Sequence, residues 1–311
     1  MPAVKVLYIA GAPRSGSTLL ERLLGGQEGL VPAGELRRIW ERGFLADQLC
    51  SCGAPFRSCP YWGKVVDAAF GGLDGVDASA LASAVDSFET RRGRWREVGR
   101  RILPAVGRRG DRDLFSNILP RLYRAILSVS GASAVIDSSK DTTYGLVLST
   151  MEDIEPRVVH LVRDSRAVAY SWQRRRRRPE IVDREEYMPV ARPTSTALGW
   201  STRNITTEAL RYFSGSYVRL RYEDLVADPD GAMAEVLGPL TDTQGGERTA
   251  SSSVGYHTVS GNPMRLAKGP LKVAADVEWK SALGRRDRVT VTALSLPLLL
   301  RYGYSPRVAS S

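Results

Sequence analysis

The chain has 311 residues, of which 43% are hydrophobic, 25% charged and 8% aromatic, a composition typical of a globular protein rather than a disordered or fibrous one. Its apolar runs are shorter than the roughly 18 to 20 residues that cross a bilayer, so we expect no membrane span. Lysine and arginine number 44 against 34 acidic residues, a formal net charge of +10, and 38 of the 44 are arginine, which favours an anionic ligand.

The first apolar run, residues 4–10, has the length and the β-branched content of a strand. Glycine and proline interrupt it at residues 11–14, too early for the core of a signal peptide, which predicts a cytoplasmic protein. A helical pattern follows over residues 18–24. A short apolar strand is then expected over 30–33 and a helix over 36–49.

Charged, helix-periodic sequence over residues 78–127 predicts a helical insertion over the core. Apolar runs over 134–137, 158–162 and 217–222 each lead into a charged loop, and another helix is expected over 289–300. Strands that are apolar throughout and separated by helices predict an α/β fold, with a parallel sheet flanked by helices on both faces. Ligands bind such sheets beyond the carboxyl ends of the strands, where these polar clusters lie.

A glycine-rich segment, Gly-Ala-Pro-Arg-Ser-Gly-Ser-Thr over residues 11–18, lies between the first strand and the first helix. Two glycines five apart allow backbone N–H groups to surround an anion at the helix N-terminus. Nucleoside triphosphatases place a lysine directly after the second glycine, but this chain has Ser17 there and a cation, Arg14, two residues before that glycine. The segment predicts a phosphate-binding loop; a purely structural glycine turn is the alternative.

This loop resembles the 5′-phosphosulfate loop of sulfotransferases that use 3′-phosphoadenosine 5′-phosphosulfate (PAPS), and its Arg-Ser-Gly-Ser-Thr form is most similar to the tyrosylprotein and bacterial branch. A second segment, residues 163–172, is similar to the 3′-phosphate motif of that family. There Arg163 stands at a strand end and Ser171 about two turns into the next helix, where a guanidinium fork and a hydroxyl would hold one phosphate.

The resemblance implies one domain over residues 1–311 with the P-loop nucleotide-kinase-like sulfotransferase fold. Its nucleotide core is expected in three segments, 1–37, 134–172 and 217–272, with the helical acceptor-side insertion over about 64–130. PAPS is implied as the sulfuryl donor and adenosine 3′,5′-bisphosphate (PAP) as the product, with no metal required. The residues implied in binding the donor are Arg14, Ser15, Gly16, Ser17, Thr18, Arg163, Ser171, Tyr222 and Arg265.

Two of these assignments, those of Tyr222 and Arg265, rest mainly on the family resemblance. Tyr222 is similar to the tyrosine that meets the adenine in this family, although a tyrosine at the core edge is the alternative. Residues 260–265, which end in Arg265, resemble the mobile basic loop that closes over the nucleotide, together with Lys268 and Lys272.

Sulfuryl transfer needs in-line placement of a hydroxyl, a base for its proton and cations for the developing charge. Glu35 follows the second strand and matches the glutamate base of the tyrosylprotein branch, and Lys140 resembles the lysine that contacts the leaving oxygen, a duty that Arg14 would share. Surface charges are the alternative for Glu35 and Lys140. Of the two histidines, His160 is expected in the core, and His257 is the second candidate for the base.

The three cysteines, Cys50, Cys52 and Cys59, lie close together in the sequence. An odd number in a cytosolic chain argues against a disulfide framework, and zinc would need a fourth ligand from His160 or His257, far along the chain. A structural role is favoured, while a metal site and a redox pair remain alternatives.

Two further functions compete with sulfuryl transfer. A P-loop kinase could use Asp137 at a strand end to hold a metal, and a nucleic-acid binding module could use the basic run 174–178, which lacks interleaved aromatic residues. The pair Arg163 and Ser171 and the missing lysine after Gly16 disfavour the kinase. A solvated basic face is the simplest interpretation of the run. The acceptor is expected to bear a hydroxyl, on a small molecule, glycan, lipid or tyrosine.

Overall fold

The computed structural model of the chain describes residues 2–89, 110–238, 256–267, 269, 271 and 273–307. Five strands form one sheet in the order β2-β3-β1-β4-β5, and every neighbouring pair is parallel. The strands are β1 (Val4–Ala10), β2 (Leu30–Gly34), β3 (Ala134–Lys140), β4 (Ile154–Val162) and β5 (Ser216–Arg221). The predicted α/β fold with its parallel sheet is confirmed.

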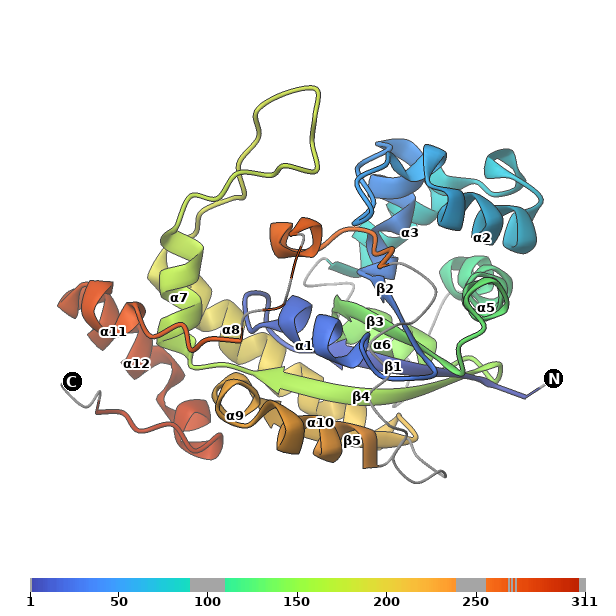
Figure 1. Ribbon diagram of the computed structural model, residues 1–311. Helices are drawn as coiled ribbons and strands as arrows, with labels where there is room; N and C mark the ends of the chain where they lie inside the picture. The colour runs from blue at the N-terminus through green and yellow to red at the C-terminus, as the bar shows by residue number, and fades with distance from the viewer. Residues whose placement is uncertain are drawn as a thin grey trace.

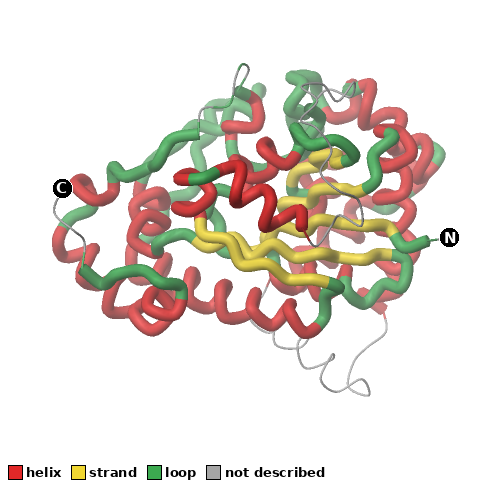
Figure 2. The backbone as a smooth tube through the Cα atoms, turned by 60° about the horizontal axis from the view of Figure 1, so that its bottom comes forward, coloured by secondary structure: helices red, strands yellow, loops and turns green. Residues whose placement is uncertain are grey.

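Helices cover both faces of the sheet, as Figures 1 and 2 show. In β1, Val6 and Tyr8 join one hydrophobic core, while Leu7 and Ile9 join the core on the opposite face. Both faces of the strand are therefore buried, which explains its continuous apolar sequence. The helices that contribute to these cores include α1 (Ser17–Leu24), α5 (Gly110–Ser130), α6 (Thr142–Leu148), α9 (Tyr222–Ala227) and α10 (Pro229–Leu237).

Further helices lie toward the two ends of the molecule (Figure 1). At one end are α2 (Pro60–Phe70) and α3 (Ala78–Glu89), next to α5. At the other end α7 (Ser165–Gln173), α8 (Pro193–Glu208), α11 (Trp279–Ala282) and α12 (Arg285–Arg301) pack together. The predicted insertion over about 64–130 thus contains helices in its described part; residues 90–109 lie outside the described residues.

Two local expectations differ from the structure. The helix expected over 36–49 is instead a short 3₁₀ helix, Leu36–Arg38, followed by a π-helical segment, Ile39–Leu45. The wide π turn places Trp40 and Phe44 together in the core, with ring centroids 5.3 Å apart. Tyr222 begins α9 rather than ending β5. In the part of the chain that the structure describes, no helix is both long and apolar enough to cross a bilayer.

A buried carboxyl group joins the first helix to the ends of two strands. Glu21 of α1 is only 2% exposed; its carboxyl accepts a hydrogen bond from the Gly34 N–H at 2.7 Å and another from the Ser138 hydroxyl at 3.1 Å. Burial is the main cause that raises the pKa of Glu21 to about 8. The folded protein therefore keeps a proton on Glu21 that the unfolded chain loses at much lower pH.

This raised pKa predicts a stability that falls as the pH rises from 4.5 toward 8, because the folded state binds more protons than the unfolded state in that window. Glu21→Gln, which mimics the protonated carboxyl, should raise the melting temperature at pH 8 and flatten its pH dependence. The exposed Glu28→Gln is the matched control and should change neither. Thermal melts from pH 5 to 9 measure this, and equal slopes for Glu21→Gln and the parent protein would contradict it.

Candidate active site

A cavity of about 640 Å³ opens where β1, β3 and β4 end, as parallel sheets predict. Among the described residues, eight cationic and two acidic ones line it, so its walls are strongly positive. Nine predicted site residues are among the lining residues: Arg14, Gly16, Ser17, Thr18, Glu35, Lys140, Arg163, Ser171 and Tyr222. Segments that are far apart in the sequence thus meet at a single cavity.

The loop after β1 presents a cation to this cavity. Arg14 has a left-handed φ of 71°, and its guanidinium lies 5.0 Å from the centre of the Trp172 ring. Both terminal nitrogens are buried and lack a hydrogen-bond partner among the described residues. Burial, followed by repulsion from Arg176, lowers the pKa of Arg14 to about 10, so the side chain stays charged at neutral pH. Buried cationic donors without partners are suited to an anionic ligand.

The second predicted phosphate site lies beside the first. The Arg163 Nη1 donates to the Arg14 carbonyl at 3.2 Å, and its Nη2 forms a 3.0 Å ion pair with Asp276. Its Nε is buried and has no hydrogen-bond partner in the described part of the chain. Ser171, in α7, lines the same cavity. Arg163 therefore has a donor free for an anion, with Asp276 as an internal competitor.

Tyr222 packs between the two sites. Its ring centroid lies 4.4 Å from the Arg163 guanidinium carbon, and a Cβ built on Gly16 would lie only 2.5 Å from Tyr222 Cδ2. Gly16 also has a left-handed φ of 96° where it caps α1, so the turn and the close approach both require glycine. Tyr222 thus packs the loop against Arg163, which agrees with the alternative of a tyrosine at the core edge.

Glu35 and Lys140 form an ion pair inside the cavity, with 2.5 Å between Lys140 Nζ and Glu35 Oε1. Glu35 follows β2 and Lys140 is the last residue of β3, and these two strands are neighbours in the sheet. Burial would raise the pKa of Glu35, but Lys140, Arg42 and Arg37 lower it to about 2. Glu35 is thus an anion at neutral pH and lies beside the flexible side chain of Lys140. In this pair the Glu35 carboxylate could accept a proton from a bound hydroxyl, and the Lys140 ammonium could stabilise negative charge.

Two predicted binding residues lie outside the cavity lining. Ser15 is buried below the loop, 2% exposed, and its hydroxyl has no hydrogen-bond partner among the described residues. Arg265 is also buried, and its guanidinium donates to the carbonyls of Thr258 at 3.1 Å and Leu49 at 2.7 Å. Because its guanidinium donates to these backbone carbonyls, Arg265 attaches its own loop to Leu49. Lys268 and Lys272, expected in that loop, lie outside the described residues.

Neither histidine lines the cavity. His160 is fully buried in β4, with Nδ1 2.6 Å from the Tyr217 hydroxyl and Nε2 2.8 Å from Asn204 Oδ1, and burial lowers its pKa to about 4. This is the satisfied core histidine that the sequence predicts. His257 lies instead beside the cysteines. Of the two candidate bases, the geometry therefore favours Glu35.

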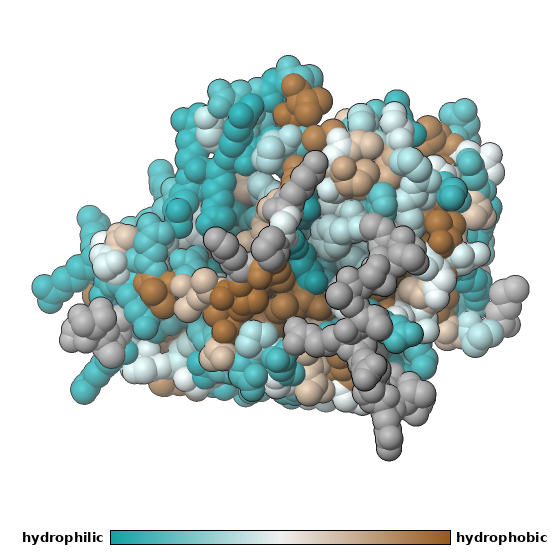
Figure 3. All heavy atoms as spheres, in the orientation of Figure 1, coloured by the Kyte–Doolittle hydropathy of each residue, from teal (hydrophilic) through white to brown (hydrophobic). Residues whose placement is uncertain are grey.

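The basic run 174–178 belongs to a loop that projects between α7 and α8 and is largely hydrophilic on its outer surface (Figures 1 and 3). Several of its cations are engaged within the protein. Arg174 pairs with Glu278, and Arg178 pairs with Glu180 and Glu186. Arg176 is the member of the run that lines the cavity. The run thus contributes one cation to the cavity, while Arg174, Arg175 and Arg177 are exposed.

Several lining residues were not identified from the sequence. They are Arg37, Arg38, Arg42, Arg203, Trp172, Trp200 and Asp276. The three arginines after Glu35 lie on the irregular 3₁₀ and π segments, whose geometry no periodic pattern indicates. No described residue between 60 and 130 lines the cavity, whereas residues within 37–42 and 188–203 do.

No protein-family model and no curated protein sequence matches the chain. Solved structures do match. The sulfotransferase domain from the curacin biosynthetic pathway superposes with a TM-score of 0.53 at 16% identity, over 99% of both chains. The sulfotransferase domain from the Synechococcus PCC 7002 olefin synthase gives 0.50 at 20% identity, over 96% of this chain and 95% of that one. The chain has a sulfotransferase fold.

The close packing of Gly16 predicts the effect of its replacement. Gly16→Ala should lower the free energy of unfolding by about 1–2 kcal/mol for the left-handed backbone alone, with a further loss from the clash with Tyr222. Gly26→Ala, beyond the other end of α1, is the control, since its added Cβ meets nothing nearer than 3.4 Å. Urea unfolding measures both, and equal midpoints would contradict the packing described.

Proposed function

We propose that the protein transfers a sulfuryl group from PAPS to a hydroxyl group of an acceptor, with Glu35 as the base. The observation that carries this proposal is the meeting of two predicted anion sites, at Arg14 and at Arg163, in one positively charged cavity. The fold, which is that of sulfotransferase domains, supports it. A donor with a phosphate at the 3′ position and a phosphosulfate at the 5′ position carries two anionic groups, one for each of these two sites in the same cavity.

The residues present fit such a donor. The unpartnered nitrogens of Arg14 and the start of α1 would hold the 5′-phosphosulfate, because a helix N-terminus and a guanidinium both favour anions. The free Nε of Arg163 and the Ser171 hydroxyl would hold the 3′-phosphate. Asp276 already pairs with Arg163, so a phosphate there would compete with this carboxylate.

When bound, PAPS supplies a sulfuryl group attached to a phosphate that can depart. The chain supplies the rest. Glu35 is ionised and can accept the proton of the acceptor hydroxyl, while Lys140 and Arg14 stabilise negative charge on the departing oxygen. The low pKa of Glu35 makes it a weak base as long as Lys140 pairs with it. Its basicity would rise when Lys140 turns from the ion pair toward the donor.

The two competing functions fit the cavity less well. Asp137, the metal-holding candidate of a kinase, is fully buried, accepts a hydrogen bond from Tyr123 at 2.5 Å and does not line the cavity. In the basic run needed by a nucleic-acid binding module, Arg174 and Arg178 pair with acidic residues of the protein itself. We therefore propose a hydroxyl-bearing acceptor, a small molecule, glycan, lipid or tyrosine, as the second substrate.

The two anion sites predict a specific ligand preference. PAP should raise the melting temperature strongly, whereas 5′-AMP and ATP with magnesium should not, because only PAP places phosphates at both sites. At about 100 times its dissociation constant, PAP should stabilise the fold by roughly 2.7 kcal/mol. Arg163→Ala should lose most of this shift, measured against its own ligand-free melt.

The matched control is Arg184→Ala, which removes the same charge from an exposed position in the projecting loop outside the cavity. It should keep the full PAP shift. A response to magnesium ATP that equals the response to PAP would instead support the kinase, and a PAP shift that survives in Arg163→Ala would remove the second anion site from the proposal.

The assignment of the base predicts a separation of binding from transfer. Glu35→Gln should bind PAP as the parent protein does, yet release PAP from PAPS at least about 100-fold more slowly in the presence of hydroxyl acceptors, because a general base contributes about 10²–10⁴-fold. The surface variant Glu152→Gln serves as the control. Turnover of Glu35→Gln at the parent rate would eliminate Glu35 as the base.

A further inference from the structure

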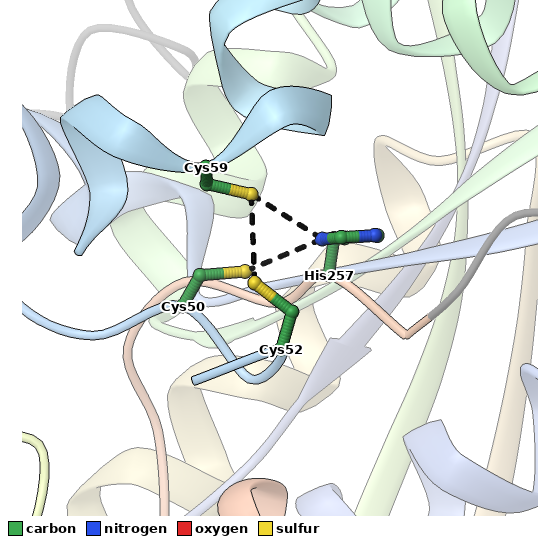
Figure 4. A group of neighbouring side chains, drawn as sticks. All are labelled: Cys50, Cys52, Cys59 and His257. Carbon is green, nitrogen blue, oxygen red and sulfur yellow. Dashed lines mark hydrogen bonds between the residues drawn. The ribbon is translucent and has the colours of Figure 1, made fainter. Parts of the chain in front are cut away.

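The three cysteines and one histidine gather into a compact cluster outside the cavity. Cys50 and Cys59 are buried, Cys52 is exposed, and His257 reaches them from a segment about 200 residues later. Their four potential ligand atoms all lie within 4.8 Å of one another. Figure 4 shows the thiols and the imidazole Nδ1 pointing toward a common centre. We propose that these four residues, Cys50, Cys52, Cys59 and His257, form a structural zinc site.

The measured separations agree with the edges of a zinc tetrahedron. Cys52 Sγ lies 3.7 Å from Cys59 Sγ, and His257 Nδ1 lies 3.3 Å from Cys59 Sγ and 3.6 Å from Cys50 Sγ. Zinc–sulfur bonds of ~2.3 Å and zinc–nitrogen bonds of ~2.0 Å at tetrahedral angles put two sulfurs ~3.8 Å apart and sulfur and nitrogen ~3.5 Å apart. Three thiolates and one imidazole are also a complete ligand set for structural zinc.

The backbone around the cluster is shaped to present these ligands. Cys50, Cys52 and Gly53 form a tight turn, in which the Gly53 N–H donates to the Cys50 carbonyl at 2.9 Å and Gly53 has a left-handed φ of 94°. Cys59 immediately precedes α2. The imidazole of His257 stacks on Tyr61, with centroids 4.9 Å apart and planes within 14°, which fixes the ring orientation. An oriented imidazole is a typical feature of metal sites.

The hydrogen bonds on either side of the cluster show which segments of the chain a bound metal would hold together. Ser51 Oγ donates to the Tyr256 carbonyl and accepts from the Thr258 N–H, both at 2.7 Å. The next residue, Val259, then pairs with the end of β2: its N–H donates to Ala33 at 3.1 Å, and its carbonyl accepts from the Glu35 N–H at 3.0 Å. Zinc would therefore fasten the cysteine loop to the segment that positions the backbone of Glu35.

A disulfide is the main chemical alternative. The sulfur atoms of Cys52 and Cys59 are 3.7 Å apart, well beyond the ~2.05 Å of a sulfur–sulfur bond. A disulfide would also leave the third thiol and His257 without a role. The zinc site uses all four groups. It involves no residue of the cavity, so its test is independent of the test of the proposed function.

The test is the metal content of the full-length chain, purified without chelator and in the presence of a thiol reductant. Elemental analysis should give about one zinc per chain. Cys52→Ser should lower that content several-fold; its side chain is exposed, so the loss of zinc cannot be attributed to a cavity in the core. Ser58→Ala, exposed in the same loop and outside the cluster, should keep the full content.

Cobalt substitution adds a readout that does not depend on folding stability. The cobalt form should show the intense visible absorption of tetrahedral thiolate coordination, and this absorption should weaken in Cys52→Ser and in His257→Ala. A strong chelator should lower the melting temperature of the parent protein, since metal binding is coupled to folding. Metal-free protein with an unchanged melt, or a Cys52–Cys59 disulfide in the mass spectrum of protein purified without reductant, would overturn the proposal.

Discussion

The parallel pairing of β1 with β4 is the constraint on which the site depends. Their register brings Ala10 opposite His160, so the loop after β1 and Arg163 after β4 begin side by side. Gly11 allows this approach, because any side chain there would collide with the Leu161 carbonyl. Arg163 then donates a hydrogen bond to the carbonyl of Arg14, which links the two proposed anion sites directly. A rigid sheet sets the distance between them before any ligand arrives.

The cavity combines many cationic side chains with a few carboxylates that pair with them. Eight cations line it, and Glu35 and Asp276 are the two acidic lining residues, each paired with a cation that the proposed donor would need. These carboxylates lessen the repulsion among the closely spaced cations. Ligand binding would release them, and for Glu35 that release would increase its strength as a base.

The strands and the phosphate loop were predictable because their signals are local: apolar runs of strand length and glycines at fixed spacing. The 3₁₀ and π segments found where a helix was expected over 36–49 were not predictable, because the π turn depends on the packing of Trp40 and Phe44 in the core. The burial of Arg265 against backbone carbonyls was not predicted, and the sequence left open whether His160 or His257 approaches the cysteines. Both depend on contacts between segments about 200 residues apart, which no sequence pattern encodes.

The most direct test of this account is a crystal structure of the protein with PAP. The 5′-phosphate should lie within the loop of residues 11–16, at the start of α1, and the 3′-phosphate should contact the Arg163 guanidinium and the Ser171 hydroxyl, with Asp276 displaced. A nucleotide whose 3′-phosphate points into solvent, away from Arg163, would contradict the account.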